Sequence, residues 1–485
     1  MKNLSLKFIV AITIGFVFSC ASDIHENFLK CLHFHNSTSI SNVVYTKSSS
    51  AYDSLLHFSI QNLRFSSNNI PKPLVIVTPL QPCHVQATVI CSQRHGLQIR
   101  IRSGGHDFEG ISYVSQVPFV IIDFINYRNI QVDLQDRTAW VQVGATVGEL
   151  YYSIATKTST LAFPAGVCPT VGVAGQFSGG GYGYLLRKYG LAADNIMDAH
   201  IIDVKGRFLD REAMGEDLFW AIRGGGGASF GVILAWKIKL VPVPSTVTLN
   251  KGELTVQALF QGLFLGGVDK VIPLMRESFL ELGLVKEDCT EMSWIEFTLH
   301  SWGFGGQPLE VLLNRSQVTR DSFKAKSDYV KHPIPESGLE GLWRLFYEDG
   351  GKGVLMVIFP FGGRMGEIPE SEIPFPHRAG VLYQIQYAVH WEEKGDEVAQ
   401  RHIHWIRKLY SYMEPFVSKS PREAYLNYRD LDIGVNNIHG YTSYEQASIW
   451  GFKYFKNNFN RLAHVKSKVD PLNFFRYEQS IPSLM

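Results

Sequence analysis

A histidine and a cysteine, each set in a glycine-rich stretch, are the residues of this chain best placed to do chemistry. His106 stands in "IRSGGHDFEG" and Cys168 in "PAGVCPTVGVAGQFSGGGYGYLL". Gly104 and Gly105 let the backbone turn sharply, so bare N–H groups can approach an anion such as a pyrophosphate. A cysteine in such a loop can be half of a disulfide, a buried thiol, a metal ligand or a bond to a group that is not protein. The residues alone leave these four readings open.

A third glycine run, "RGGGGASFG" (223–231), lies further along the chain. In the second run the spacing of Gly179, Gly181 and Gly183 differs from the Rossmann fingerprint, and no ribose-binding acid follows at about 20 residues. None of the three runs contains Gly-Lys-Ser/Thr, which excludes a P-loop. A mobile loop is the simplest interpretation of each run taken singly. Three runs flanked by strands favour one long dinucleotide wrapped by backbone.

Strand-like segments rich in valine and isoleucine must position these runs between residues 70 and 245. They include "PLVIVTP", "LQIRIRSGG", "PFVIIDF", "TAWVQVGA" and "GVILAWKIKLVPVP", several with period-2 alternation. Short helical stretches such as "VGELYYSIATK" lie between them without regular βαβ spacing, so we expect an α+β domain rather than a doubly wound sheet. The segment "VPVPST" (241–246) is typical of a linker.

The second half of the chain has a different pattern. "VDKVIPLMRESFLELG" and "DEVAQRHIHWIRKLYSYMEPFV" predict amphipathic helices, and "VLYQIQYAVHW" predicts a strand with alternating faces. The aromatic, turn-rich tail has too little apolar surface to form a domain, so we expect it to fold back onto the first domain.

The N-terminus and the overall charge indicate where the protein works. Lys2 and Lys7 precede the apolar run "FIVAITIGFVF", which is followed by the small residues "SCAS". This run is too short to span a bilayer and is typical of a secretory signal, with cleavage near Ser22. The 485 residues carry a formal net charge of +1 without long runs of one sign. We therefore expect no nucleic-acid partner and no stable membrane association. The leader predicts a secreted protein, located in the extracellular apoplast, with the cell wall or the vacuole as alternatives.

Removal of the leader leaves five of the six cysteines. An odd count in a secreted protein indicates at least one thiol with another role. Asn36 and Asn314 lie in N-glycosylation sequons that the same pathway could use.

Long motifs carry a resemblance to a known family. The stretches "RSGGHDFEG", "GVCPTVGVAGQFSGGGYG", "AIRGGGGASFGV", "YLNYRDLD" and "VDPLNFFRYEQSIP" resemble the plant berberine bridge enzyme-like flavoproteins, close to the cannabinoid synthase-like branch, from Glu26 onward. The resemblance implies an α+β, two-domain vanillyl-alcohol-oxidase (PCMH-type) fold with a substrate domain built on an antiparallel sheet. Its implied parts are a signal peptide (1–22), an FAD-binding domain (23–245), a substrate-binding domain (246–420) and a C-terminal segment (421–485) packed on the FAD domain.

The resemblance also implies how the cofactor is held. In this family FAD has two covalent bonds, from a histidine to the 8α-methyl and from a cysteine to C6, and His106 and Cys168 match these positions. An imidazole and a thiolate are side chains able to add to an electron-poor flavin. Cys31 and Cys91 match the family's disulfide. Further cofactor contacts are implied at Arg102, Ser103, Gly104, Gly105, Val171, Gly172, Ser178, Gly179 and Gly180.

For substrate chemistry the resemblance points to tyrosines. Tyr428 matches the active-site tyrosine, which must lose a proton although a phenol has a pKa near 10. Tyr113 and Tyr182 match other pocket rings, and Gln386 matches the alcohol-oxidising pattern on its strand. The chain departs from that pattern at Gln384, where a cation is usual, and at Gln176, where a histidine is usual. It also lacks a piece of the substrate domain near residues 250–254.

The expected function is that of a secreted FAD-linked oxidase. It would take a hydride from an alcohol, sugar or phenolic or terpenoid natural product to flavin N5, and pass the electrons to O2 to give H2O2. Val171, a small side chain near Cys168, matches the position that leaves room for O2 over the ring. The alternatives are an oxidative cyclase of the cannabinoid synthase type and a non-redox flavin-containing cyclase or binding protein. We expect a monomer whose partners are a small-molecule substrate and O2.

Overall fold

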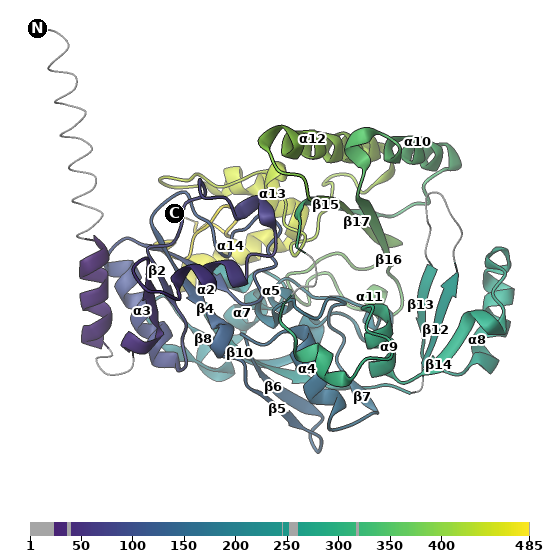
Figure 1. Cartoon of the computed structure of the whole chain (residues 1–485), viewed down its shortest axis with the longest axis horizontal. Helices are drawn as coiled ribbons and strands as arrows, with labels where there is room; N and C mark the ends of the chain where they lie inside the picture. Colours follow the sequence, from purple (N-terminus) through teal and green to yellow (C-terminus); the bar gives the residue numbers. More distant parts are fainter. Residues whose placement is uncertain (1–23, 36–39, 245, 252–259, 317–319, 485) are drawn as a thin grey trace, which may run out of the picture.

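Figure 1 shows the computed structural model of the chain, coloured from purple at the N-terminal end to yellow at the C-terminal tail. It describes residues 24–35, 40–244, 246–251, 260–316 and 320–484.

The first sheet carries the loop of His106. Its order is β1 (Val44–Thr46), β2 (Val75–Val77), β4 (Phe119–Asp123) and β3 (Gln98–Arg102), with β2, β4 and β3 parallel. All five residues of β4 are buried, as expected of a central parallel strand covered on both faces. The helix α3 (Pro82–Arg94) makes the crossover from β2 to β3, so the domain contains a parallel crossover that the irregular sequence spacing did not reveal.

The second sheet of this half is antiparallel and contains the largest core. Its order is β5 (Ile130–Asp133), β6 (Thr138–Gln142), β10 (Val232–Lys239), β8 (Ile196–Ile202) and β9 (Phe208–Leu209). The central strand β10 is buried over its first five residues. The strands predicted from valine and isoleucine runs are thus confirmed as two packed sheets.

In the second half, one sheet bears the strand with the two glutamines. Its order is β15 (Ser322–Val330), β17 (Tyr383–Trp391) and β16 (Val354–Pro360), all antiparallel. Alternate residues of β17 from Tyr383 to Trp391 pack against α10 (Glu336–Phe346) and α12 (Asp396–Met413), which cover one face of the sheet (Figure 1). Gln384 and Gln386 therefore lie on the opposite face.

A second, smaller antiparallel sheet follows the first half of the chain directly. It has the order β13 (Phe260–Phe264), β12 (Thr246–Lys251) and β14 (Cys289–Met292), and α8 (Val268–Ser278) flanks it. The described residues of the second half thus form two three-stranded antiparallel sheets. Lys251 is the register partner of Phe260, so these two residues, which flank the region expected to be shortened, are neighbours in the sheet.

The segment expected to be a linker begins as a strand. Residues Val241–Pro242 form β11, which pairs antiparallel with β7 (Leu161–Ala162). The prolines did suggest an irregular connection, but a proline is tolerated in a short edge strand.

The tail packs on the first half through α13 (Tyr444–Phe455) and α14 (Asn458–Val469). The ammonium of Lys466 is fully buried and donates to the carbonyl of Ser229 at 2.7 Å and to Asp470 at 2.6 Å. The remaining α-helices are α2 (Tyr52–Phe58), α4 (Val147–Ala155), α5 (Val173–Ser178), α6 (Leu186–Tyr189), α7 (Arg211–Ile222), α9 (Trp294–Ser301) and α11 (Arg364–Glu367).

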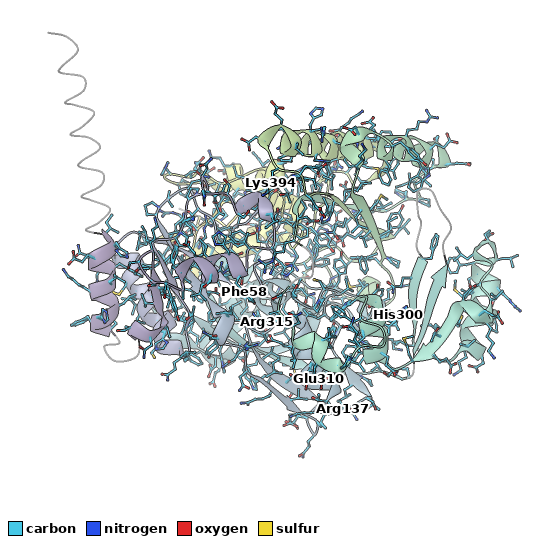
Figure 2. The ribbon with its side chains drawn as sticks, viewed as in Figure 1. Phe58, Arg137, His300, Glu310, Arg315 and Lys394 are labelled. Carbon is cyan, nitrogen blue, oxygen red and sulfur yellow. A yellow bond between two sulfur atoms is a disulfide. The ribbon has the colours of Figure 1, made fainter. Side chains whose placement is uncertain are left out.

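Arg315, labelled in Figure 2, ties the second half to the first. Its Nη1 donates to the carbonyl of Gly144 at 3.0 Å and to Glu149 at 2.6 Å, and Glu149 caps the N-terminus of α4.

The neighbouring sequon residue Asn314 is exposed, whereas Asn36 and the leader lie outside the described residues. No helix within the described ranges is long and apolar enough to cross a bilayer.

The disulfide between Cys31 and Cys91 is confirmed, and it joins the helical residues 24–35 covalently to α3. It closes a loop with a sequence separation of 60 residues. Replacing both cysteines by serine is expected to destabilise the protein by about 4 kcal/mol, mainly by freeing the unfolded chain. Cys289→Ser is the control and should leave the denaturation midpoint in guanidinium unchanged. Equal midpoints for the double variant and the wild type would contradict the prediction.

Candidate active site

His106 and Cys168 converge on one hydroxyl group. The Nε2 atom of His106 lies 2.9 Å from Oγ1 of Thr170, and the Sγ atom of Cys168 lies 3.7 Å from the same oxygen. Cys168 belongs to no disulfide among the described residues and is half-buried. The imidazole and the thiol, far apart in sequence, are thus presented side by side.

Direct contact between two backbones brings them together. A Cβ added to Gly104 would lie 2.4 Å from the amide nitrogen of Gly172, and one added to Gly172 would lie 2.3 Å from that of Gly104. Gly172 is bridged on its other side to Thr146, just before α4. The loop after β3 and the loop before α5 can approach this closely only because both residues lack side chains.

The third glycine run meets the second through Ser178. The carbonyl of Ser178 accepts hydrogen bonds from the N–H groups of Gly224 at 2.8 Å and Gly226 at 2.9 Å. Gly180 has φ of 123°, which favours glycine, and a Cβ on Gly179 would clash with the Asn427 side chain. All three glycine runs therefore belong to one site.

A cluster of aromatic rings forms the side of the site nearest the tail. The hydroxyl groups of Tyr182 and Tyr428 are hydrogen-bonded at 2.5 Å, and Tyr425 packs against both rings. Phe108 stacks on Tyr428 with ring centroids 5.3 Å apart and planes at 6°. Phe359 of β16 packs edge-on against Tyr182 at 4.7 Å.

Burial sets the protonation states of the two central groups. It lowers the pKa of His106 to about 4, so the ring is neutral at physiological pH and one of its two nitrogens carries no proton. It raises the pKa of Tyr428 to about 12, although the hydrogen bond from Tyr182 acts in the opposite direction. Tyr428 is therefore a protonated phenol at pH 7.

Several predicted residues join this site through backbone contacts. The hydroxyl of Ser103 donates to the carbonyl of Val143 at 2.6 Å, which fixes the strand end next to Gly104. Gly105 has φ of 71° and lies against the carbonyl of Ser59. The carbonyl of Val171 accepts the N–H of Val147, so Val171 is held at the start of α4.

Gln386 stands at the edge of the aromatic cluster. Its register partner on β15 is Ser327, whose hydroxyl accepts the N–H of Tyr425 at 2.9 Å. Gln384 is buried and lies opposite Phe359, on the same sheet face as the ring that contacts Tyr182.

Two predicted residues lie elsewhere. The guanidinium of Arg102 is fully buried and donates to Asp123 and to the carbonyls of Leu55 and Leu56, so its described contacts are architectural. Tyr113 packs in a separate cluster, with its ring 6.4 Å from that of Phe65. The structure does not bring either side chain to Tyr428.

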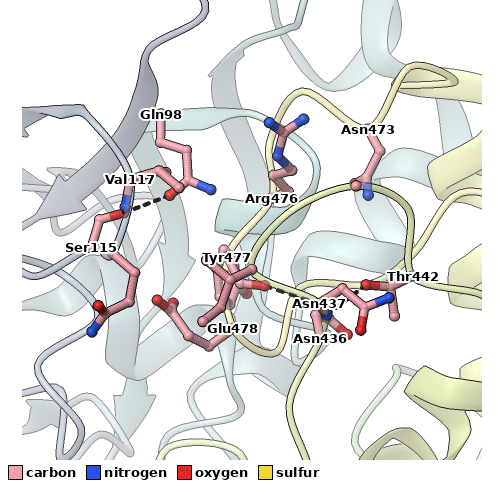
Figure 3. Close-up of a pocket in the computed structure, with 13 residues that line it drawn as sticks. Gln98, Ser115, Val117, Asn436, Asn437, Thr442, Asn473, Arg476, Tyr477 and Glu478 are labelled. Carbon is pink, nitrogen blue, oxygen red and sulfur yellow. Dashed lines mark hydrogen bonds between the residues drawn. The ribbon is translucent and has the colours of Figure 1, made fainter. Parts of the chain in front are cut away.

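Sequence reasoning missed Thr170, Phe108 and Tyr425. Each is adjacent to, or a few residues from, a residue that was singled out, so proximity in the chain was the available signal. A separate small hollow of about 30 Å³, shown in Figure 3, lies between the first sheet and the tail. It is lined by polar side chains including Gln98, Ser115, Asn436, Arg476 and Glu478, and by none of the residues predicted for the site.

The residues of the site fit FAD. The 8α-methyl group and C6 belong to the same ring of the isoalloxazine. A double attachment therefore needs an imidazole and a thiol that lie close together and face the space in which this ring would bind. His106 and Cys168 around Thr170 satisfy this requirement. Gly104, Gly105 and Gly172 keep side chains out of the space beside His106, which suits a close approach of backbone to a pyrophosphate.

Comparison with known proteins gives the family. Residues 73–211 match the model of the FAD binding domain, and residues 424–482 match that described as berberine and berberine like. Tetrahydroberberine oxidase of Berberis wilsoniae is 52% identical over 94% of each chain, and cannabidiolic acid synthase-like 1 of Cannabis sativa is 49% identical over 95% of this chain and 93% of the relative.

Solved structures agree with this result. The structure of the Arabidopsis thaliana protein described as BBE-like #28 superposes with a TM-score of 0.89, at 48% identity over 95% of this chain and 100% of that one. Wild-type Phl p 4.0202, described as a glucose dehydrogenase, superposes with a TM-score of 0.90 at 43% identity over 94% of this chain and 99% of that one. The chain belongs to the berberine bridge enzyme-like family of FAD-dependent oxidoreductases and has its PCMH-type α+β fold.

The alignments also bear on chain length. The alignment with the Berberis wilsoniae protein extends over 502 residues, although this chain has only 485. That relative therefore carries residues with no counterpart here.

Gly104→Ala tests the backbone contact that builds the site. The new methyl group would overlap the amide of Gly172, and Gly104 does not have a positive φ, so the effect is steric. We expect the free energy of unfolding to fall by at least about 2 kcal/mol, which lowers the apparent Tm by several degrees. Gly175→Ala is the matched control, because nothing lies within 4 Å of its added Cβ. If Gly104→Ala and the control variant had equal Tm values, the close backbone contact between Gly104 and Gly172 would be refuted.

Proposed function

We propose that FAD is bound covalently through His106 and Cys168. The observation that carries the proposal is the convergence of both reactive atoms on the Thr170 hydroxyl. A neutral imidazole is the nucleophilic form, and the low pKa of His106 keeps that form populated at physiological pH. Thr170 accepts from or donates to the imidazole and thereby orients it.

We further propose that the protein oxidises an alcohol, a sugar, or a phenolic or terpenoid natural product. When bound, FAD accepts a hydride at N5 and passes the electrons to O2, which yields H2O2. Tyr428 takes the proton of the substrate hydroxyl as the adjacent C–H bond breaks, so the product is a carbonyl compound. Tyr182 stabilises the phenolate of Tyr428 by donating the hydrogen bond that joins the two hydroxyl groups.

The second half of the chain provides the other wall of the proposed substrate site. Phe359 and the glutamines of β17 share the sheet face that meets Tyr182. The relatives support oxidation of small molecules, since one is named a tetrahydroberberine oxidase and one a glucose dehydrogenase. The small side chain of Val171 beside Cys168 supports the use of O2. The leader and the exposed Asn314 support a secreted glycoprotein.

Intact mass after denaturation tests the attachment. After deglycosylation, guanidinium denaturation and desalting, the wild type is expected to retain the mass of one FAD. His106→Ala and Cys168→Ala should each retain it through the remaining bond, and the double variant should release it. Cys289→Ser serves as the control and should keep the adduct. A wild-type mass equal to that of the apoprotein, with the yellow colour in the small-molecule fraction, would refute the proposal.

The pKa of Tyr428 predicts an alkaline dependence of flavin reduction. With a pKa of about 12, only about one phenol in 10⁵ is ionised at pH 7. Bleaching of the flavin by a sugar or aromatic alcohol, followed anaerobically by stopped flow, should therefore accelerate about tenfold per pH unit from pH 7 to about 10.

Two variants separate Tyr428 from other groups in that experiment. Tyr428→Phe should abolish the rise with pH. Tyr182→Phe should lower the rate at each pH, because loss of its hydrogen bond raises the pKa of Tyr428 further. A wild-type rate that levels off below about pH 9 would assign the proton to another group.

A further inference from the structure

Two segments that are far apart in the chain contact each other through consecutive residues of the first segment. One follows His106, and the other contains Tyr428. Asp107 pairs with Arg429 at 3.2 Å, and Phe108 stacks on Tyr428. The next residue, Glu109, accepts the N–H of Leu431 at 3.4 Å. We call residues 107–109 and 428–431 together the clasp.

The ion pair of the clasp is held rigidly on both sides. The Oδ1 atom of Asp107 accepts the N–H groups of Glu109 at 3.0 Å and Ile111 at 3.1 Å, which leaves Oδ2 for Arg429. The guanidinium of Arg429 also lies over the ring of Tyr477 at 5.4 Å. Burial alone would lower the pKa of Arg429, but Tyr477 and Asp107 raise it instead, so the arginine stays charged.

Buried charges continue the clasp into the second half of the chain. The ammonium of Lys324 on β15 contacts Glu109 and lies 2.8 Å from Asp430. Lys326 lies 2.6 Å from the other oxygen of Asp430. Both lysines are almost completely buried, so their charges require these carboxylates.

We propose that Asp107 and Arg429 are positioning residues that fix the phenol of Tyr428 relative to the flavin attached at His106. The inference rests on the proposed function, because it concerns the proton transfer assigned to Tyr428. Each residue of the pair is the chain neighbour of one reacting group, so the pair sets the distance between the two groups. Proton transfer requires hydrogen-bond contact, and a displacement of about 1 Å can lower a rate about a hundredfold.

Asp107→Asn is the test, because the asparagine oxygen still accepts the two backbone N–H groups. Its amide nitrogen replaces Oδ2, so the negative charge and the acceptor for Arg429 are both removed. Anaerobic stopped flow should give a rate of flavin reduction about tenfold to a hundredfold lower, with the apparent substrate Kd unchanged. Arg429→Lys retains the charge and should lose less activity than Arg429→Gln.

Asp217→Asn is the matched control. Asp217 also joins the first half to the tail, through Arg461 at 3.2 Å and Lys468 at 2.9 Å, but this pairing is exposed and involves none of the clasp residues. Its rate should equal that of the wild type.

A double-mutant cycle distinguishes positioning from general damage. If Asp107 acts through Tyr428, then Asp107→Asn should change the rate less than about twofold in the Tyr428→Phe background. Equal losses in both backgrounds would overturn the proposal.

Hydrogen exchange provides a readout that does not need turnover. By mass spectrometry, peptides covering residues 428–432 should exchange faster in Asp107→Asn than in the wild type or in Asp217→Asn, with the flavin adduct retained. Unchanged exchange in these peptides would also overturn the proposal. If no tested substrate bleaches the wild-type flavin, the proposed function fails, and the exchange result decides on the clasp by itself.

Discussion

The contact between the backbones of Gly104 and Gly172 is the constraint on which the rest of the site depends. It joins the end of a parallel strand to the loop before α5, and it places an imidazole and a thiol around one hydroxyl group. A side chain at either glycine would separate the loops by the width of a methyl group, and the two reactive atoms would then no longer share Thr170. The chemistry of His106 and Cys168 therefore depends on two residues that have no chemistry of their own.

The surroundings of the site separate the roles of its two titratable groups. Removal of water disfavours the charged form of each, so the same physical cause leaves the imidazole neutral and the phenol protonated. A neutral imidazole is ready to form a bond, whereas a protonated phenol must be activated before it can accept a proton. Tyr182 is the described neighbour that favours activation. In the proposed mechanism, the flavin is attached once, whereas Tyr428 must accept a proton in each catalytic cycle.

Features that depend on short stretches of sequence, such as strands and glycine-rich motifs, could be predicted from the sequence. Valine and isoleucine runs marked the strands, and the motifs around His106 and Cys168 pointed to two residues that the structure brings together at Thr170. Contacts between residues that are far apart in the sequence could not be predicted in this way. Arg102 opens the first glycine motif and was assigned to the cofactor, yet it forms a buried ion pair with Asp123, which only the pairing of β3 with β4 brings near. Thr170 was overlooked because its importance comes from the meeting of two distant loops.

The division of the second half into two small sheets has a similar origin. Each strand was visible as an alternating or apolar segment, but strand order depends on pairing between segments that are remote in sequence. In the hairpin of β12 and β13, Lys251 and Phe260 are register partners, so the two strands end next to each other and a short connection suffices.

The buried lysines of β15 have a consequence for the order in which the protein is made. Their counter-ions come from Glu109, early in the chain, and from Asp430, close to its end. Until the ribosome has delivered the final segment, both ammonium groups lack most of their compensation, and burying them would be strongly unfavourable. Burial of the two lysines between these carboxylates thus has to wait until translation is nearly complete.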